Sequence, residues 1–140
     1  PYRGEAGHRH LAGHVWASAP WTGADNWDEN EQWLHGLDLF DHRFYWESHE
    51  CWELLWHAIP HRHPDRELVQ ALIQAAAFVI KRHTQTERAA TALLGRSLAR
   101  LHALSAAQGP IHMGVHLLGL TIILRDFEAG GPWPRVPMAR

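Results

Sequence analysis

The chain has little cysteine and no strong excess of charge of either sign, and both absences exclude classes of protein. Cys51 is the only cysteine among 140 residues, so no internal disulfide can form and a secreted disulfide scaffold is excluded. Thirteen Lys and Arg against 15 Asp and Glu give a formal net charge of −2. That balance offers no basic surface for a nucleic acid and no polybasic membrane anchor. We expect a cytoplasmic protein with no nucleic-acid partner.

Long hydrophobic runs are also missing. The longest uninterrupted apolar run, residues 75–80, is far shorter than the roughly 20 residues of a membrane helix. The first residues contain no apolar core of a signal peptide, so we expect no membrane association. Hydrophobic residues make up 46% and charged residues 20% of the chain, which is ordinary globular usage and excludes wholesale disorder. The length fits a single domain.

Tryptophan and histidine are abundant instead, with 8 Trp and 13 His. Three of the indoles belong to residues 1–27, which are rich in Gly, Pro and His and show no helical or alternating pattern. Because free indoles are unfavourable in water, we expect this irregular arm to pack on the domain through Trp16, Trp21 or Trp27. Deleting the arm should then lower the melting temperature by several degrees, at roughly 4 °C or less per kcal/mol.

The rest of the chain has the pattern of helices. Apolar residues recur every three or four positions through segments separated by turns, Pro or Gly. The predicted helices span residues 28–40, 44–58, 65–83, 87–107 and 111–129. Asp28 and Glu31 have the spacing of a capping box, and no segment alternates as a strand would. We predict an all-α fold, a bundle of about five antiparallel helices over residues 28–129 with an irregular tail over residues 130–140.

The second predicted helix is the most informative segment, because ionisable side chains lie among aromatic ones. At about 100° per residue, His49 and Glu53 share one sector of this helix with Trp46, Trp52 and Trp56. Residues four apart can touch, and an aromatic surround raises the cost of leaving either polar group unpaired. We therefore predict that His49 and Glu53 are hydrogen-bonded to each other, mostly buried and central to any site.

Three uses of this pair remain open. The pair can be a structural contact that serves stability alone, in which case Glu53→Gln should cost about 1 to 3 kcal/mol. The pair can instead ligate a divalent transition metal, with a further ligand from another helix or the His-rich arm. It can also be an acid–base pair with shifted pKa values. Position 53 is Glu, so the zincin motif His-Glu-x-x-His is absent and metalloprotease chemistry is not supported.

Several segments together resemble the bacterial and archaeal domain-of-unknown-function family number 309. They are residues 37–40, the signature Trp-Glu-x-His-Glu-x-x-Glu-x-x-Trp within residues 44–56, and a Leu-Ile-Gln-x-Ala-Ala helix at residues 72–77. The resemblance spans about residues 28–124 and implies a compact helical bundle with no established activity. The family's signature residues map onto Glu47, His49, Glu50, Glu53, Trp56, Gln74 and Lys81. Residues 83–86 and His116 depart from the family's usual pattern.

Further candidates come from the neighbouring segments. A pocket between the second and third helices would pair Lys81 with Glu53 or Glu50 beside Gln74, although the same stripe also fits a solvated face. The pocket candidates are His49, Glu50, Glu53, Trp56, Gln74 and Lys81. The pair His112 and His116 has the i, i+4 spacing of two metal ligands on one helix. Cys51 lies outside the His49–Glu53 sector and is expected to be a small packing residue.

These observations favour a binding or interaction module whose aromatic-lined polar pocket around His49 and Glu53 holds a small molecule or a protein. The alternative is a metal-dependent, hydrolase-like enzyme that uses His49 and neighbouring carboxylates around a divalent transition metal. The sequence contains no phosphate-binding loop, nucleophile elbow or dinucleotide fingerprint. A Trp-rich arm or an apolar face on the last helix could also support a homodimer.

Overall fold

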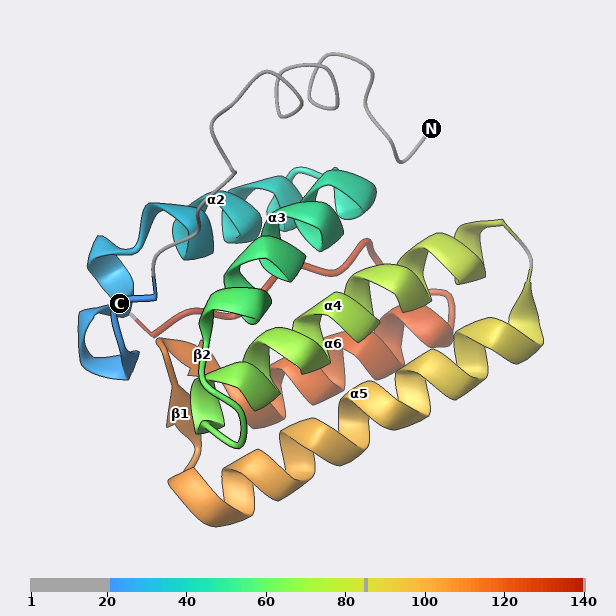
Figure 1. The fold of residues 1–140 in the computed structure, drawn as a ribbon. Coiled ribbons are helices and arrows are strands. Elements are labelled where there is room, and N and C mark those ends of the chain that lie inside the picture. The colour runs from blue at the N-terminus through green and yellow to red at the C-terminus, as the bar shows by residue number, and fades with distance from the viewer. Residues whose placement is uncertain (1–20, 85, 140) are drawn as a thin grey trace.

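Five α-helices and one short hairpin make up the described part of the chain. The computed structural model describes residues 21–84 and 86–139. The elements in order are the 3-10 helix η1 (Ala24–Glu29), α2 (Glu31–Asp41), α3 (Tyr45–Ala58), α4 (Pro64–His83), α5 (Glu87–Gln108), β1 (Ile111–His112), β2 (Val115–His116) and α6 (Leu117–Glu128). Helix α4 lies between α3 and α5, with α2 beside α3 and α6 beside α5 (Figure 1). The predicted all-α bundle is confirmed.

Helix α4 forms the centre of the core. Leu68, Leu72 and Phe78 are fully buried, and small alanines between them let the neighbouring helices come close. The buried hydroxyl of Ser97 on α5 donates a hydrogen bond of 2.8 Å to the backbone oxygen of Ala71 on α4. This hydrogen bond joins the two helices directly. Among the described residues, no helix combines the length and apolar character that crossing a membrane requires.

The start of the first helix differs from the prediction. Asp28 lies in η1 instead of capping a helix, so the capping box with Glu31 is wrong. Asn30 is the cap of α2, because it has an extended backbone and its side-chain oxygen accepts a hydrogen bond of 2.9 Å from the backbone N–H of Trp33. Helix α2 therefore begins three residues later than the sequence pattern indicates.

The last helix also begins later than predicted. Residues 111–116 form an antiparallel hairpin in which Ile111 pairs with His116, and the turn residues Met113 and Gly114 both have positive φ, 45° and 79°. At Gly114 an added Cβ would come within 2.7 Å of the Trp27 ring, so this close approach requires glycine. A two-residue strand is too short to show alternation, which explains why the sequence pattern missed it.

The segment that follows α6 is held against the bundle by hydrogen bonds. The backbone N–H of the buried Val136 donates to Oδ1 of Asp41 at 2.8 Å, and the Tyr45 hydroxyl donates to the backbone oxygen of Pro134 at 3.1 Å. Because Tyr45 is the first residue of α3 and Asp41 the last residue of α2, these hydrogen bonds attach the C-terminal tail to the junction of the two helices. Its path positions the N-terminal end of the helix that carries the predicted site.

Most of the predicted N-terminal arm, including Trp16, lies outside the described residues. Trp21 and Trp27 are described, and both are half-buried against the core. The contribution of the whole arm to stability stays a prediction.

Candidate functional site

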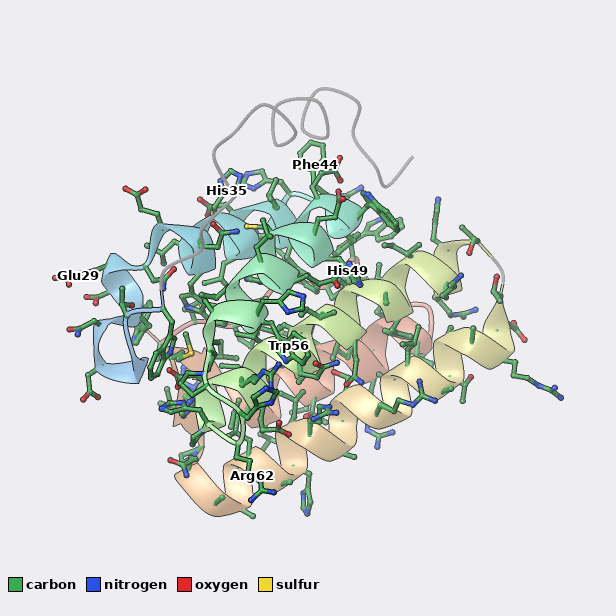
Figure 2. The ribbon with its side chains drawn as sticks, viewed as in Figure 1. Glu29, His35, Phe44, His49, Trp56 and Arg62 are labelled. Atoms are coloured by element: carbon green, nitrogen blue, oxygen red, sulfur yellow. The ribbon has the colours of Figure 1, made fainter. Side chains whose placement is uncertain are left out.

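The predicted site lies along one side of α3. Trp46, His49, Glu53 and Trp56 follow one another at intervals of three, four and three residues, so they line up along the helix. We call these four residues the polar–aromatic stripe. The indoles of Trp46 and Trp56 and the His49 ring are half-buried and Glu53 is exposed, whereas Trp52 and Leu55 of the same helix are fully buried in the core. Figure 2 shows His49 and Trp56 on the side of α3 that faces the viewer.

His49 and Glu53 are in contact, as predicted, but only His49 is mostly buried. Nδ1 of His49 lies 2.9 Å from Oε1 of Glu53, and their side chains are 23% and 48% exposed. The contact is not the predicted hydrogen bond, since Nδ1 meets no acceptor with hydrogen-bond geometry, and it becomes an ion pair only when His49 is protonated. The Trp46 ring stacks parallel to the His49 ring, with the centroids 6.0 Å apart. The burial prediction holds for His49 and is wrong for Glu53, because the outer part of this side of α3 borders solvent.

Helix α4 adds a cation to the far end of the stripe. The guanidinium of Arg66 lies over the Trp56 ring, 3.8 Å from the centroid, which is a cation–π contact. His61, in the loop before α4, contacts the same guanidinium through Nδ1. A carboxylate, an imidazole and a guanidinium are therefore presented on one surface between indole rings. Such a surface offers hydrogen-bond donors, an acceptor and apolar ring faces to a ligand.

The other pocket candidates do not join this group through described contacts. Gln74 is turned toward α5, where its Oε1 accepts a hydrogen bond of 3.1 Å from Nε of Arg100. Lys81 and Glu50 are exposed, and no ion pair joins Lys81 to Glu50 or Glu53. The structure thus brings together His49, Glu53 and Trp56, while a pocket built from all six candidates stays a prediction.

The described residues offer only part of the set of side chains that a metal ion needs as ligands. Within residues 21–84 and 86–139, no three His, Cys, Asp or Glu side chains are grouped closely enough to hold a metal ion. The predicted pair His112 and His116 does not share a helix face, since both residues belong to the hairpin. His112 is buried, whereas His116 is exposed, so this ligand pair is a wrong prediction.

A buried carboxylate that the sequence analysis missed lies at the start of α4. Asp65 is fully buried and accepts hydrogen bonds of 2.7 Å from Nε1 of Trp21 and 2.8 Å from Nε2 of His112. Burial alone would raise the pKa of the Asp65 carboxyl, but these hydrogen bonds and the nearby charges of His112 and His63 hold the pKa below its ordinary value. The partners lie 44 and 47 residues away in sequence, so no local spacing could indicate them.

Cys51 is placed as expected for a packing residue. Its side chain is 2% exposed, and burial raises the pKa of the thiol to about 12. Its sulfur donates a weak hydrogen bond of 3.4 Å to the backbone oxygen of Gln32 in α2. The thiol therefore carries almost no thiolate at neutral pH, which fits a packing residue. Glu47, the first acidic residue of the signature, is also fully buried.

Comparison with known proteins identifies a family of domains. No curated protein and no solved structure matches the chain. The model of a family described as "Domain of unknown function (DUF309)" matches residues 33–93, which run from α2 into α5 and include the polar–aromatic stripe. Over residues 33–93, less than half of its length, the chain is therefore similar to the DUF309 family of domains of unknown function, as the signature residues of α3 and α4 indicate.

Proposed function

We propose that this protein is a binding module whose site is the polar–aromatic stripe of α3 together with Arg66 of α4. The observation that carries the proposal is the contact of His49 with the exposed Glu53, which lies beside the Trp46 indole. Even with a protonated His, a partly exposed pair of this kind stabilises a fold by less than about 1 kcal/mol. Stability alone therefore gives little reason for the arrangement, whereas recognition of a ligand does.

The chemistry of the stripe indicates the kind of ligand. Trp and Arg are the side chains most enriched among the residues that dominate binding energy at interfaces. From Trp46 to Trp56 the stripe is about 15 Å long, at a rise of 1.5 Å per residue. That length suits an extended segment of a partner protein more than a compact metabolite. Glu53 would accept hydrogen bonds from the segment, while Arg66 and His49 would donate to it.

Selection of displayed 12-residue peptides on the folded protein tests the proposal, followed by calorimetric titration of the selected peptides. We expect Glu53→Gln and Trp56→Ala to weaken binding at least tenfold. The matched control is Glu87→Gln, which removes another exposed glutamate that contacts a basic side chain, Arg82 at 3.7 Å. Peptides that bind the stripe variants and the control with equal affinity would contradict the proposal.

The alternative function, a metal-dependent hydrolase, rests on the 2.9 Å distance between Nδ1 of His49 and Oε1 of Glu53. Imidazole nitrogens and carboxylate oxygens both serve as metal ligands. A hydrolase would need a third ligand and an open position for water. Elemental analysis of untagged protein, repeated on His49→Ala, distinguishes the two functions. Stoichiometric metal that is lost with His49 would favour the enzyme over the binding module.

A further inference from the structure

The outer face of α5 and α6 carries an exposed apolar ridge. Leu118 and Ile122 lie one turn apart on α6 and are 68% and 52% exposed, which is unusual for large aliphatic side chains. Beside this ridge, α5 and α6 enclose a groove of about 460 Å³. The α5 side of the groove contains Gly95 and Ala99, and a Cβ added at Gly95 would meet nothing within 4 Å. Leu98, Leu101 and His102 also line the groove, but Gly95 and Ala99 are exposed, and we call this strip of small residues on α5 the trough.

Two opposite charges flank this face. Asp126 continues the ridge one turn beyond Ile122, and Arg96 lies next to the trough on α5. Both side chains are exposed, and neither makes an ion pair or a side-chain hydrogen bond with another described residue. Asp126 and Arg96 can therefore pair across an interface only where the ridge of one molecule lies on the trough of another.

We infer that this face is the interface of a two-fold symmetric homodimer, in which α6 of each copy lies on α5 of its partner. The short connection after α5 makes α5 and α6 antiparallel, so Arg125 and Gly95 line the same end of the groove, and Leu118 and Ser105 the other. A two-fold axis parallel to these helices keeps like ends together. It places Ile122 over the partner's trough and brings Asp126 near Arg96 of the partner subunit.

We infer that a second copy of the chain covers this face, because a two-fold interface requires the same surface to carry both members of each complementary pair. Ridge, trough, acid and base all belong to this one face. The 12 residues of α6 give a face roughly 18 Å long, and two adjacent helices about 20 Å wide. A face of that size covers roughly 360 Å² on each copy, which is less than a stable complex buries, so we expect a weak, reversible dimer with Kd in the high micromolar range.

Sedimentation equilibrium of the full chain over micromolar to submillimolar concentrations tests the dimer. We expect Ile122→Asp to make the protein monomeric across this range. The matched control is Ile111→Asp, an aliphatic residue of similar exposure, 44%, which does not line the groove. Wild-type protein that stays monomeric would overturn the inference, as would an Ile122→Asp variant that still dimerises.

The arrangement of helices has its own test. Asp126→Arg and Arg96→Asp should each weaken association at least tenfold by placing like charges together. The double variant should recover wild-type association, because the exchanged charges again meet across the interface. Failure of the double variant to recover, with each single variant shown by circular dichroism to be folded, would overturn the placement of α6 on the partner's α5.

Discussion

At the scale of single residues, Asp65 joins more distant parts of the chain than any residue of the predicted site. Its carboxylate accepts from Trp21, which precedes η1, and from His112 in β1, while Asp65 itself belongs to the first turn of α4. Its backbone N–H also donates to Nδ1 of His63. A buried carboxylate with these partners stabilises the fold only while it is charged and fully hydrogen-bonded.

Asp65→Asn should therefore destabilise the protein by about 3 kcal/mol, because it removes a buried charge from its donors. The pKa of Asp65 in the folded state is lower than in the unfolded state. Its contribution is fully present above the unfolded value of about 4 and is lost as the pH falls through the lower folded value. Urea denaturation at pH 7 and in acid measures both effects. A difference between wild type and variant that does not shrink in acid would contradict this account.

The Cys51 thiol should be unreactive in the folded protein. Burial raises its pKa to about 12, so almost no thiolate exists at pH 8. We expect labelling by a thiol-specific disulfide reagent to proceed only as fast as the protein opens, and to become rapid in denaturant. Fast labelling of native protein would show that α2 and α3 separate readily at this position.

Glu53→Gln should cost less than about 1 kcal/mol, because the Glu53 side chain is half exposed and its ion pair is screened by solvent. This expectation replaces the larger cost that burial would have implied. Thermal unfolding beside the Glu87→Gln control measures it. A cost well above 2 kcal/mol would mean that the pair serves the fold, and the binding proposal would lose its main support.

At the scale of elements, the packing of α2 on α3 depends on a missing side chain. An added Cβ at Gly36 would overlap the indole of Trp52, which is fully buried and packs at a tilt against Trp33 and Phe40. The two helices can approach this closely only because Gly36 has no side chain. A close approach of this kind also fixes the rotation of α3 that turns the stripe outward.

Gly36→Ala should destabilise the protein by about 1 to 3 kcal/mol through overpacking, although Ala favours a helix by about 1 kcal/mol over Gly. Adding Trp52→Phe to this variant should recover part of the loss, since the smaller ring leaves room for the methyl group. Chemical denaturation of the three variants measures the coupling. A stabilised Gly36→Ala protein would show that α2 and α3 pack less closely.

At the scale of the whole molecule, the last segment closes the bundle at the α2–α3 junction. Val136 is 5% exposed, and its backbone and that of Pro134 bond to Asp41 and Tyr45. Removing residues 132–140 would leave the buried Tyr45 hydroxyl and the Asp41 carboxylate without these partners. The tail is thus part of the folded unit although it contains no helix.

Truncation before residue 132 should lower the melting temperature by about 10 °C, for a loss of roughly 3 kcal/mol. Val136→Ala alone should cost about 1 kcal/mol, because it removes only apolar contact. Differential scanning calorimetry of both proteins gives the values. A truncated protein that melts at the wild-type temperature would show that the tail only covers the surface.

The sequence by itself determined most helices of this protein. Helices α3, α4 and α5 begin and end within one or two residues of prediction, because proline and glycine stop helices locally. The contact of His49 with Glu53 was also predictable, since four residues make one helical turn. All of these features depend on interactions within a few residues along the chain.

Only the tertiary structure decided which side of each helix meets another element. It left Glu53 half exposed, turned Gln74 toward α5 and brought His112 to Asp65. It also replaced the first turns of the last predicted helix with a hairpin whose turn packs against Trp27. Burial and hydrogen bonds between distant residues depend on how whole helices pack, and the spacing of residues along one helix does not contain that information.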